Sequence, residues 1–77
     1  MRDSPSPVIL NRDALIALRV RTGLNKQELA DLAGIDRTLI TRLENGERRA
    51  TPAVMKKLAV ALDVSLLAIS GPEEIAV

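Results

Sequence analysis

The chain of 77 residues has no cysteine, no histidine and no aromatic residue. Without cysteine and histidine it cannot form disulfide bonds, a thiol nucleophile, a serine–histidine relay or zinc sites of thiolate and imidazole. Without aromatic rings it has no stacking platform of the kind that single-strand and RNA-binding proteins use. The carboxylates are scattered and no base stands beside a hydroxyl, so we expect no enzyme activity, no metal and no cofactor.

Long apolar runs are also missing. No stretch approaches the roughly 20 apolar residues that cross a bilayer. The first ten residues, MRDSPSPVIL, lack the basic start and long apolar stretch of a signal peptide. We therefore expect a cytoplasmic protein with no membrane partner.

Charge is distributed unevenly along the chain. The net charge is only +1. The segment from Arg12 to Lys57, however, holds ten basic and six acidic residues, and the tails carry the compensating acid. With 47% hydrophobic and 27% charged residues the composition is globular. A chain of this length can bury only one small core, which favours a single domain that is steadied by dimerisation.

Proline and glycine divide the chain into three parts. Residues 1–10 contain two Ser-Pro pairs and no periodicity, which predicts an extended or disordered lead. Within this lead, Val8–Leu10 could pack onto the domain or add a short strand. Residues 11–70 form the predicted domain. Residues 71–77 begin with Gly-Pro and make a short acidic tail.

Capping residues and apolar spacing predict five helices. The expected caps are Asn11, Asn25, Asp36, Thr51 and Ser65. The helices should span Arg12 to about Thr22, Lys26 to Ala33, Arg37 to Glu44, a segment that starts at Pro52, and Leu66 to about Ser70. Their inward-facing residues should be Leu15, Leu18, Val20, Leu29, Ala30, Ala33, Ile40, Leu43, Val54, Leu58, Ala61 and Leu62.

The most informative stretch is Leu24–Gly46, LNKQELADLAGIDRTLITRLENG. It contains two short helices joined by a tight turn. Gly34 suits the turn, and Ala30 and Ala33 are small enough for two helices to cross closely. The second helix carries a polar outer face of the size that enters a DNA major groove.

This stretch resembles the helix-turn-helix of the Cro/C1-type, or XRE-like, family of phage repressors and bacterial regulators. The resemblance continues upstream through Leu15-x-x-Leu18-Arg19-x-x-x-Gly23-Leu24 and downstream through Leu58-Ala59-x-x-Leu62-x-Val64-Ser65, so that it covers about residues 12–69. It implies an all-α, compact five-helix, lambda-repressor-like DNA-binding domain. The second and third helices would form the helix-turn-helix.

The resemblance also implies which residues meet the bases. The positions on the third helix that would face DNA are Arg37, Thr38, Thr41 and Arg42. Arginine suits guanine O6 and N7, and threonine can contact a base edge or a thymine methyl group. Leu39 could contact thymine methyl groups or shield the groove edge. The alternative for the two arginines is an ordinary solvated helix face, and Asp36 is assigned mainly to capping.

Phosphate contacts are expected at the start of the second helix and in the loop after the third. The first group is Asn25, Lys26 and Gln27, because backbone N–H groups and the positive end of a helix favour an anion. The second group is Arg48 and Arg49, for which a solvated charge run is the alternative. In related proteins the residues at Arg19 and Glu44 pair, so we expect a structural ion pair there.

The leading functional hypothesis is a sequence-specific regulator of transcription that binds double-stranded DNA. Its simplest form is a small Cro-like repressor of phage or prophage type, associated with the nucleoid. A homodimer would read an inverted-repeat operator, because two-fold pairing sets two recognition helices on successive major-groove faces. Candidates for the dimer interface are Leu66, Leu67, Ile69, Ile75 and Val77, with Val8–Leu10 as the alternative.

Two other functions remain open. One is the DNA-binding antitoxin of a toxin–antitoxin pair, whose C-terminal tail would cover a protein partner. The other is a protein-interaction module that keeps the fold but has lost DNA affinity. Apolar and acidic residues near the reading surface favour the second alternative, namely Asp31, Leu32, Asp36 and Leu39.

Overall fold

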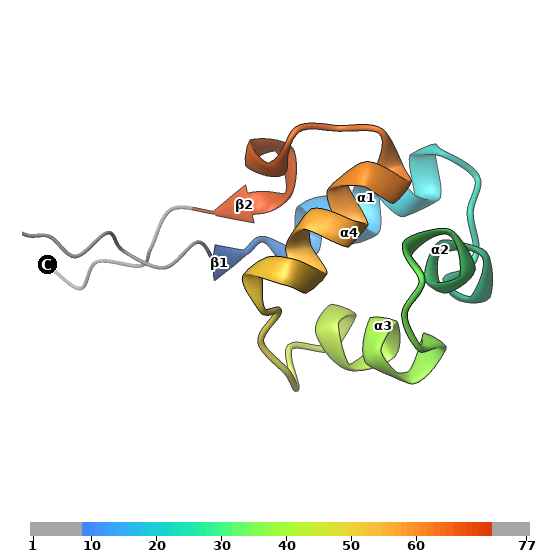
Figure 1. Cartoon of the computed structure of the whole chain (residues 1–77), viewed down its shortest axis with the longest axis horizontal. Coiled ribbons are helices and arrows are strands. Elements are labelled where there is room, and N and C mark those ends of the chain that lie inside the picture. Colours follow the sequence, from blue (N-terminus) through green and yellow to red (C-terminus); the bar gives the residue numbers. More distant parts are fainter. Residues whose placement is uncertain (1–8, 72–77) are drawn as a thin grey trace, which may run out of the picture.

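The computed structural model describes residues 9–71, which form helices around one core and a small antiparallel sheet (Figure 1). The elements are β1 (Ile9–Leu10), α1 (Arg12–Arg21), α2 (Lys26–Ala33), α3 (Arg37–Glu44), α4 (Pro52–Leu62), the 3-10 helix η1 (Leu66–Ile69) and β2 (Ser70–Gly71). The mainly helical class is as expected. None of the helices in this range is long and apolar enough to span a membrane.

The predicted caps explain where the helices start. The side chains of Asn11, Asn25 and Thr51 each accept a hydrogen bond from the backbone N–H three residues further on. At α2 the cap is reciprocal, because the Glu28 carboxylate accepts from the backbone N–H of Asn25 at 2.8 Å. Asp36 caps α3 through a longer contact of 3.4 Å to the N–H of Thr38. These satisfied donors confirm four of the five predicted starts.

The fifth predicted helix begins at the expected residue but is wrong in type. Leu66–Ile69 forms a single 3-10 turn, and Ser65 makes no side-chain cap. The hydroxyl of Ser70 instead donates to the carbonyl of Leu66 at 2.6 Å. The chain then becomes extended at Ser70 to pair with β1, so only four residues are left for the helix. That length allows i→i+3 hydrogen bonds and is too short for a regular α-helix.

The sheet was one of two outcomes that the sequence left open for the segment before Asn11. In the antiparallel pair, Ile9 lies opposite Gly71 and Leu10 opposite Ser70. The backbone N–H of Asn11 also donates to the carbonyl of Ile69 at 2.8 Å. The pairing therefore holds the two ends of the described chain side by side, at the end of the domain where β1 and β2 lie in Figure 1.

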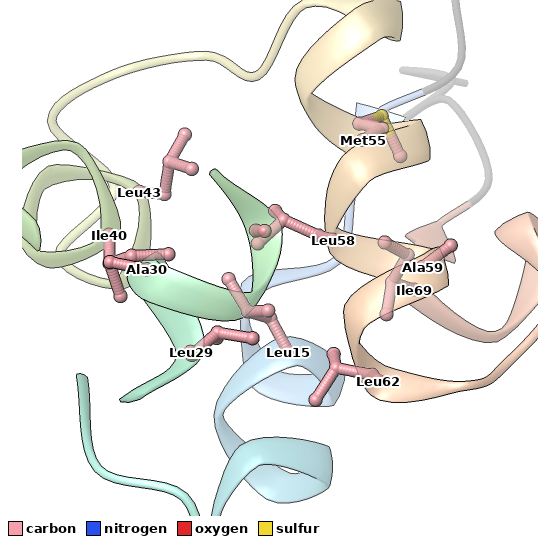
Figure 2. Close-up of a cluster of buried hydrophobic side chains, with 11 residues drawn as sticks. Leu15, Leu29, Ala30, Ile40, Leu43, Met55, Leu58, Ala59, Leu62 and Ile69 are labelled. Carbon is pink, nitrogen blue, oxygen red and sulfur yellow. The ribbon is translucent and has the colours of Figure 1, made fainter. Parts of the chain in front are cut away.

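Eleven apolar residues from α1, α2, α3, α4 and η1 form the core (Figure 2). They are Leu15, Leu29, Ala30, Ala33, Ile40, Leu43, Met55, Leu58, Ala59, Leu62 and Ile69. Most were predicted, but Met55, Ala59 and Ile69 were not. Met55 and Ala59 are buried because α4 is covered by both α2 and η1 and so buries a wider stripe. Val20 was predicted to face inward and is instead 63% exposed.

The burial of Ile69 contradicts its predicted place in the dimer interface. Ile69 is fully buried beneath α4, so its side chain has no surface to offer a second copy. Leu66 and Leu67 from the same turn are exposed and keep that role as expectations. Val8, Ile75 and Val77 lie outside the described residues.

Candidate nucleic-acid interface

The exposed face of α3 is determined by which of its side chains are buried in the core. Ile40 and Leu43 are buried in the core, and the helix periodicity then turns Arg37, Thr38 and Arg42 outward to solvent. Gly34 ends α2 in the left-handed conformation, with φ of 69°, and Ala30 and Ala33 pack where α2 and α3 meet. This turn places α3 across α2 with its polar face free.

Two members of the expected reading face are less accessible. Thr41 is half-buried, so only part of its side chain reaches the surface. Leu39 is half-buried too and packs against the core cluster. Its position explains this, because Leu39 lies one helical turn from Leu43 and on the same side as Ile35. Leu39 acts mainly as an anchor of α3.

An ion pair joins α1 to the C-terminal end of α3. The guanidinium of Arg19 donates from Nε to Glu44 Oε2 at 2.6 Å and from Nη2 to Oε1 at 3.1 Å. Its Nη1 also donates to the carbonyl of Leu24 at 3.0 Å. The side chains are 14% and 5% exposed, respectively. One arginine thus fixes α1, the α1–α2 connection and α3 relative to each other.

A cationic hollow lies beside the reading face. It has a volume of about 440 Å³ and is open to solvent. Its lining consists of Arg19, Asn25, Lys26, Gln27 and Arg37. Three of the five carry positive charge, and the N-terminus of α2 adds backbone N–H groups and the positive end of its dipole. The structure therefore brings all three residues predicted at the start of α2 together with Arg37.

Gln27 is held in place from within its own helix. Its Nε2 donates to the Asp31 carboxylate at 2.8 Å, one turn along α2. This contact leaves the Gln27 amide oxygen and its second N–H available to a ligand. Asp31 thereby holds Gln27, through a pair whose i,i+4 spacing is visible in the sequence.

Arg48 and Arg49 lie apart from the first hollow. They border a second hollow, of about 230 Å³, together with apolar side chains that include Ile9, Leu10 and Leu43. Arg12, which sequence reasoning did not single out, completes this arginine cluster. A β-carbon at Gly46 would collide with the Arg12 guanidinium, so the two residues pack directly. No local signal predicts this contact, because the partners are far apart in sequence.

Comparison with known proteins identifies the same segment. A family model described as "HTH_3: Helix-turn-helix" matches residues 15–69. The competence pilus inhibition repressor of Acinetobacter baylyi is 39% identical over 49 residues, and the match covers 64% of this chain. It spans only 44% of that repressor.

Solved structures resemble the fold over most of its length. The restriction-modification controller protein C.AhdI from Aeromonas hydrophila has a TM-score of 0.73 and 35% identity, covering 74% of this chain and 86% of the controller. An HTH_3 family transcriptional regulator from Vibrio cholerae has a TM-score of 0.73 and 31% identity, covering 75% of this chain and 33% of that regulator. These relatives are described as repressors, controllers and regulators.

Proposed function

The chain belongs to the HTH_3 helix-turn-helix family, and from this membership we propose that it is a sequence-specific, double-stranded DNA-binding regulator of transcription. The observation that carries the proposal is the polar face of α3. Arg37, Thr38 and Arg42 project from a helix whose opposite side is rooted in the core. A single exposed helix of this kind fits the major groove, which is about 12 Å wide.

The side chains on α3 suit base recognition. Arg37 and Arg42 each present a guanidinium that can bind guanine O6 and N7 with two parallel hydrogen bonds. Thr38 can donate to or accept from a base edge, and its methyl group can meet a thymine methyl. Thr41 contributes less because it is half-buried, and Leu39 contributes at most the edge of its side chain.

Cationic groups near both ends of α3 suit the DNA backbone. Lys26 and the first backbone N–H groups of α2 would hold one phosphate in the larger hollow, with Asn25 and Gln27 as neutral donors. Arg48 and Arg49, in the loop between α3 and α4, would contact a phosphate beyond the end of the recognition helix. Phosphate contacts fix the register of the helix, and base contacts supply the sequence preference.

The finer proposal is a repressor that acts as a homodimer on an inverted repeat. Two copies related by a two-fold axis would place their α3 helices about 34–36 Å apart, one helical turn of DNA. Leu66 and Leu67 are the exposed apolar residues proposed for the interface. A Cro-like or phage repressor and the controller of a restriction-modification system are both compatible roles, as is a place in the cytoplasm with the nucleoid.

Selection of bound fragments from a genomic library, at two salt concentrations, tests this function. We expect discrete sites with an approximate inverted repeat, and an affinity whose logarithm falls linearly with the logarithm of salt concentration. Retention of no fragment at low salt would overturn the proposal. Retention of all fragments alike would leave DNA binding but remove sequence recognition by α3.

A protein-interaction module without DNA affinity is the competing proposal. Leu32 favours it, because this large apolar side chain is 62% exposed on α2 beside the reading face. Leu39, the other apolar residue cited for that function, is instead half-buried and packs against the core. The antitoxin alternative depends on a tail that lies outside the described residues, and a neighbouring gene for a small toxin would distinguish it.

A further inference from the structure

The second hollow combines positive charge with an apolar floor. Arg12, Arg48 and Arg49 stand around it, and Ile9, Leu10 and Leu43 provide apolar surface from β1 and α3. Its volume of about 230 Å³ corresponds to a few aliphatic side chains. The arginines can bind a DNA phosphate, but the apolar surface adds nothing to such a contact. The site is therefore better matched to an occupant that is acidic and apolar at once.

The arginines of this hollow lack acidic partners in the described part of the chain. Within residues 9–71 the ion pair that forms joins Arg19 to Glu44, and none involves Arg12, Arg48 or Arg49. Three guanidinium groups near one another repel, and an anionic occupant would relieve that repulsion. Charge complementarity thus calls for carboxylates.

The chain itself carries such an occupant next to the hollow. Gly71 is paired with Ile9, which lines the hollow, and the sequence continues from Gly71 as Pro-Glu-Glu-Ile-Ala-Val. Six residues can span about 20 Å when extended. Residues 72–77 therefore start beside the hollow with ample reach. Their two acidic residues followed by Ile75 and Val77 match its cationic and apolar parts in turn.

We propose that residues 72–77 dock into the second hollow of the same molecule, with Glu73 and Glu74 toward the arginines and Ile75 and Val77 toward the apolar floor. A tethered segment has an effective concentration in the millimolar range, so even a weak site is occupied. The consequence for DNA rests on the proposed function. The docked tail would compete with phosphate for Arg48 and Arg49 and so lower DNA affinity.

Docking can be tested without DNA by a paramagnetic label on the tail of the full chain. Because the chain has no cysteine, Ala76→Cys gives a single attachment site. We expect the label to broaden the amide NMR signals of Gly46 and Ala50 several-fold more than those of the α1–α2 connection, at the opposite end of the domain from β1 (Figure 1). The matched control adds Arg48→Gln and Arg49→Gln, which should undock the tail and weaken the broadening at Gly46 and Ala50 to the level that its attachment beside the hollow produces.

Two results would overturn docking within one molecule. The first is broadening that is equal at both ends of the domain or that the Arg48→Gln and Arg49→Gln changes leave undiminished. The second comes from a mixture of spin-labelled chains with isotopically labelled chains that carry no spin label. Broadening that arises only between molecules would show that the tail binds a second copy instead.

The DNA consequence is tested with a change that leaves the charge intact. Ile75→Ser with Val77→Ser should undock the tail and tighten binding to a selected DNA site about two- to fivefold at low salt, as expected for the loss of one weak competing contact. Val60→Ser, at an exposed apolar residue of α4, should leave binding unchanged. Equal affinity of the tail variant and the native chain would overturn the competition. Absence of DNA binding by every variant would overturn the proposed function, while the label experiment would still decide docking.

Discussion

At the scale of single residues, Arg19 is the charged side chain that links the most segments within the described region. One guanidinium donates to both oxygens of Glu44 and to the carbonyl of Leu24. Such a pair adds little net stability compared with apolar residues of the same size, but removal of one partner leaves a desolvated charge behind. The geometry of α3 relative to α1 depends on this contact.

Replacement of Glu44 by leucine should therefore be costly. We expect Glu44→Leu to lower the free energy of unfolding by about 3 kcal/mol, because Arg19 would keep its charge in a largely buried place. Urea unfolding followed by circular dichroism measures the change. Glu47→Gln, at an exposed position, is the matched control and should cost less than about 0.5 kcal/mol. A Glu44→Leu variant as stable as the control would show that the pair has no structural role.

Arg37 and Lys26 should separate base reading from phosphate binding. Arg37→Ala should cost about 1–3 kcal/mol at particular base positions and relax the preference there. Lys26→Ala should weaken all sequences alike and reduce the slope of log affinity against log salt by about 1. Binding titrations against single-base variants of a selected site distinguish the two patterns. Uniform losses for both variants would contradict the assignment of α3 as the reading helix.

At the scale of elements, the C-terminus of α4 is strained. Asp63 caps the helix with φ of 57°, the one residue other than glycine with a positive φ in the described range. An aspartate there also places a negative charge at the negative end of the helix dipole. A glycine would remove both penalties, as it does at the end of α2.

We expect Asp63→Gly to raise the free energy of unfolding by about 0.5–1 kcal/mol. Asp63→Asn, which removes only the charge, should give a smaller gain. The converse control is Gly34→Ala, where an added β-carbon meets no atom and only the backbone conformation suffers. It should destabilise the domain by about 1 kcal/mol. Thermal unfolding measures all three, and a loss of stability in Asp63→Gly would refute the strain.

Most elements could be predicted from the sequence because their signals are local. Asn25 and Glu28 define the start of α2 within four residues, and the spacing of Ile40 and Leu43 defines the inner face of α3. The 3-10 turn could not be predicted, and the strand before Asn11 could only be left open as one of two outcomes, because both depend on Ser70 meeting Leu10 from the other end of the described chain. The contact of Arg12 with Gly46 is hidden for the same reason. The half-buried state of Leu39 could have been predicted, because Leu39 lies one helical turn before the buried Leu43.

At the scale of the whole molecule, the proposed dimer interface rests on the exposed leucines of η1. Leu67 is 83% exposed in η1, so its replacement should leave the core intact. Leu67→Asp should convert the proposed dimer to a monomer and weaken operator binding, with an unchanged melting temperature at high dilution. Sedimentation equilibrium measures the mass, and Val20→Asp on α1 is the control. Dimers that persist in Leu67→Asp would move the interface elsewhere.

The pairing of β1 with β2 makes the described chain almost a closed ring. Ile9 and Gly71 already lie opposite each other in antiparallel register, the geometry that a two-residue hairpin turn can join. A backbone cyclised at that point would keep every helix contact. The unfolded cyclic chain would have fewer conformations than the unfolded linear chain, so the entropy gained on unfolding would be smaller. A circular permutant, in which the ring is opened at another loop, would begin with a different element. In each such permutant α3 would present the same face.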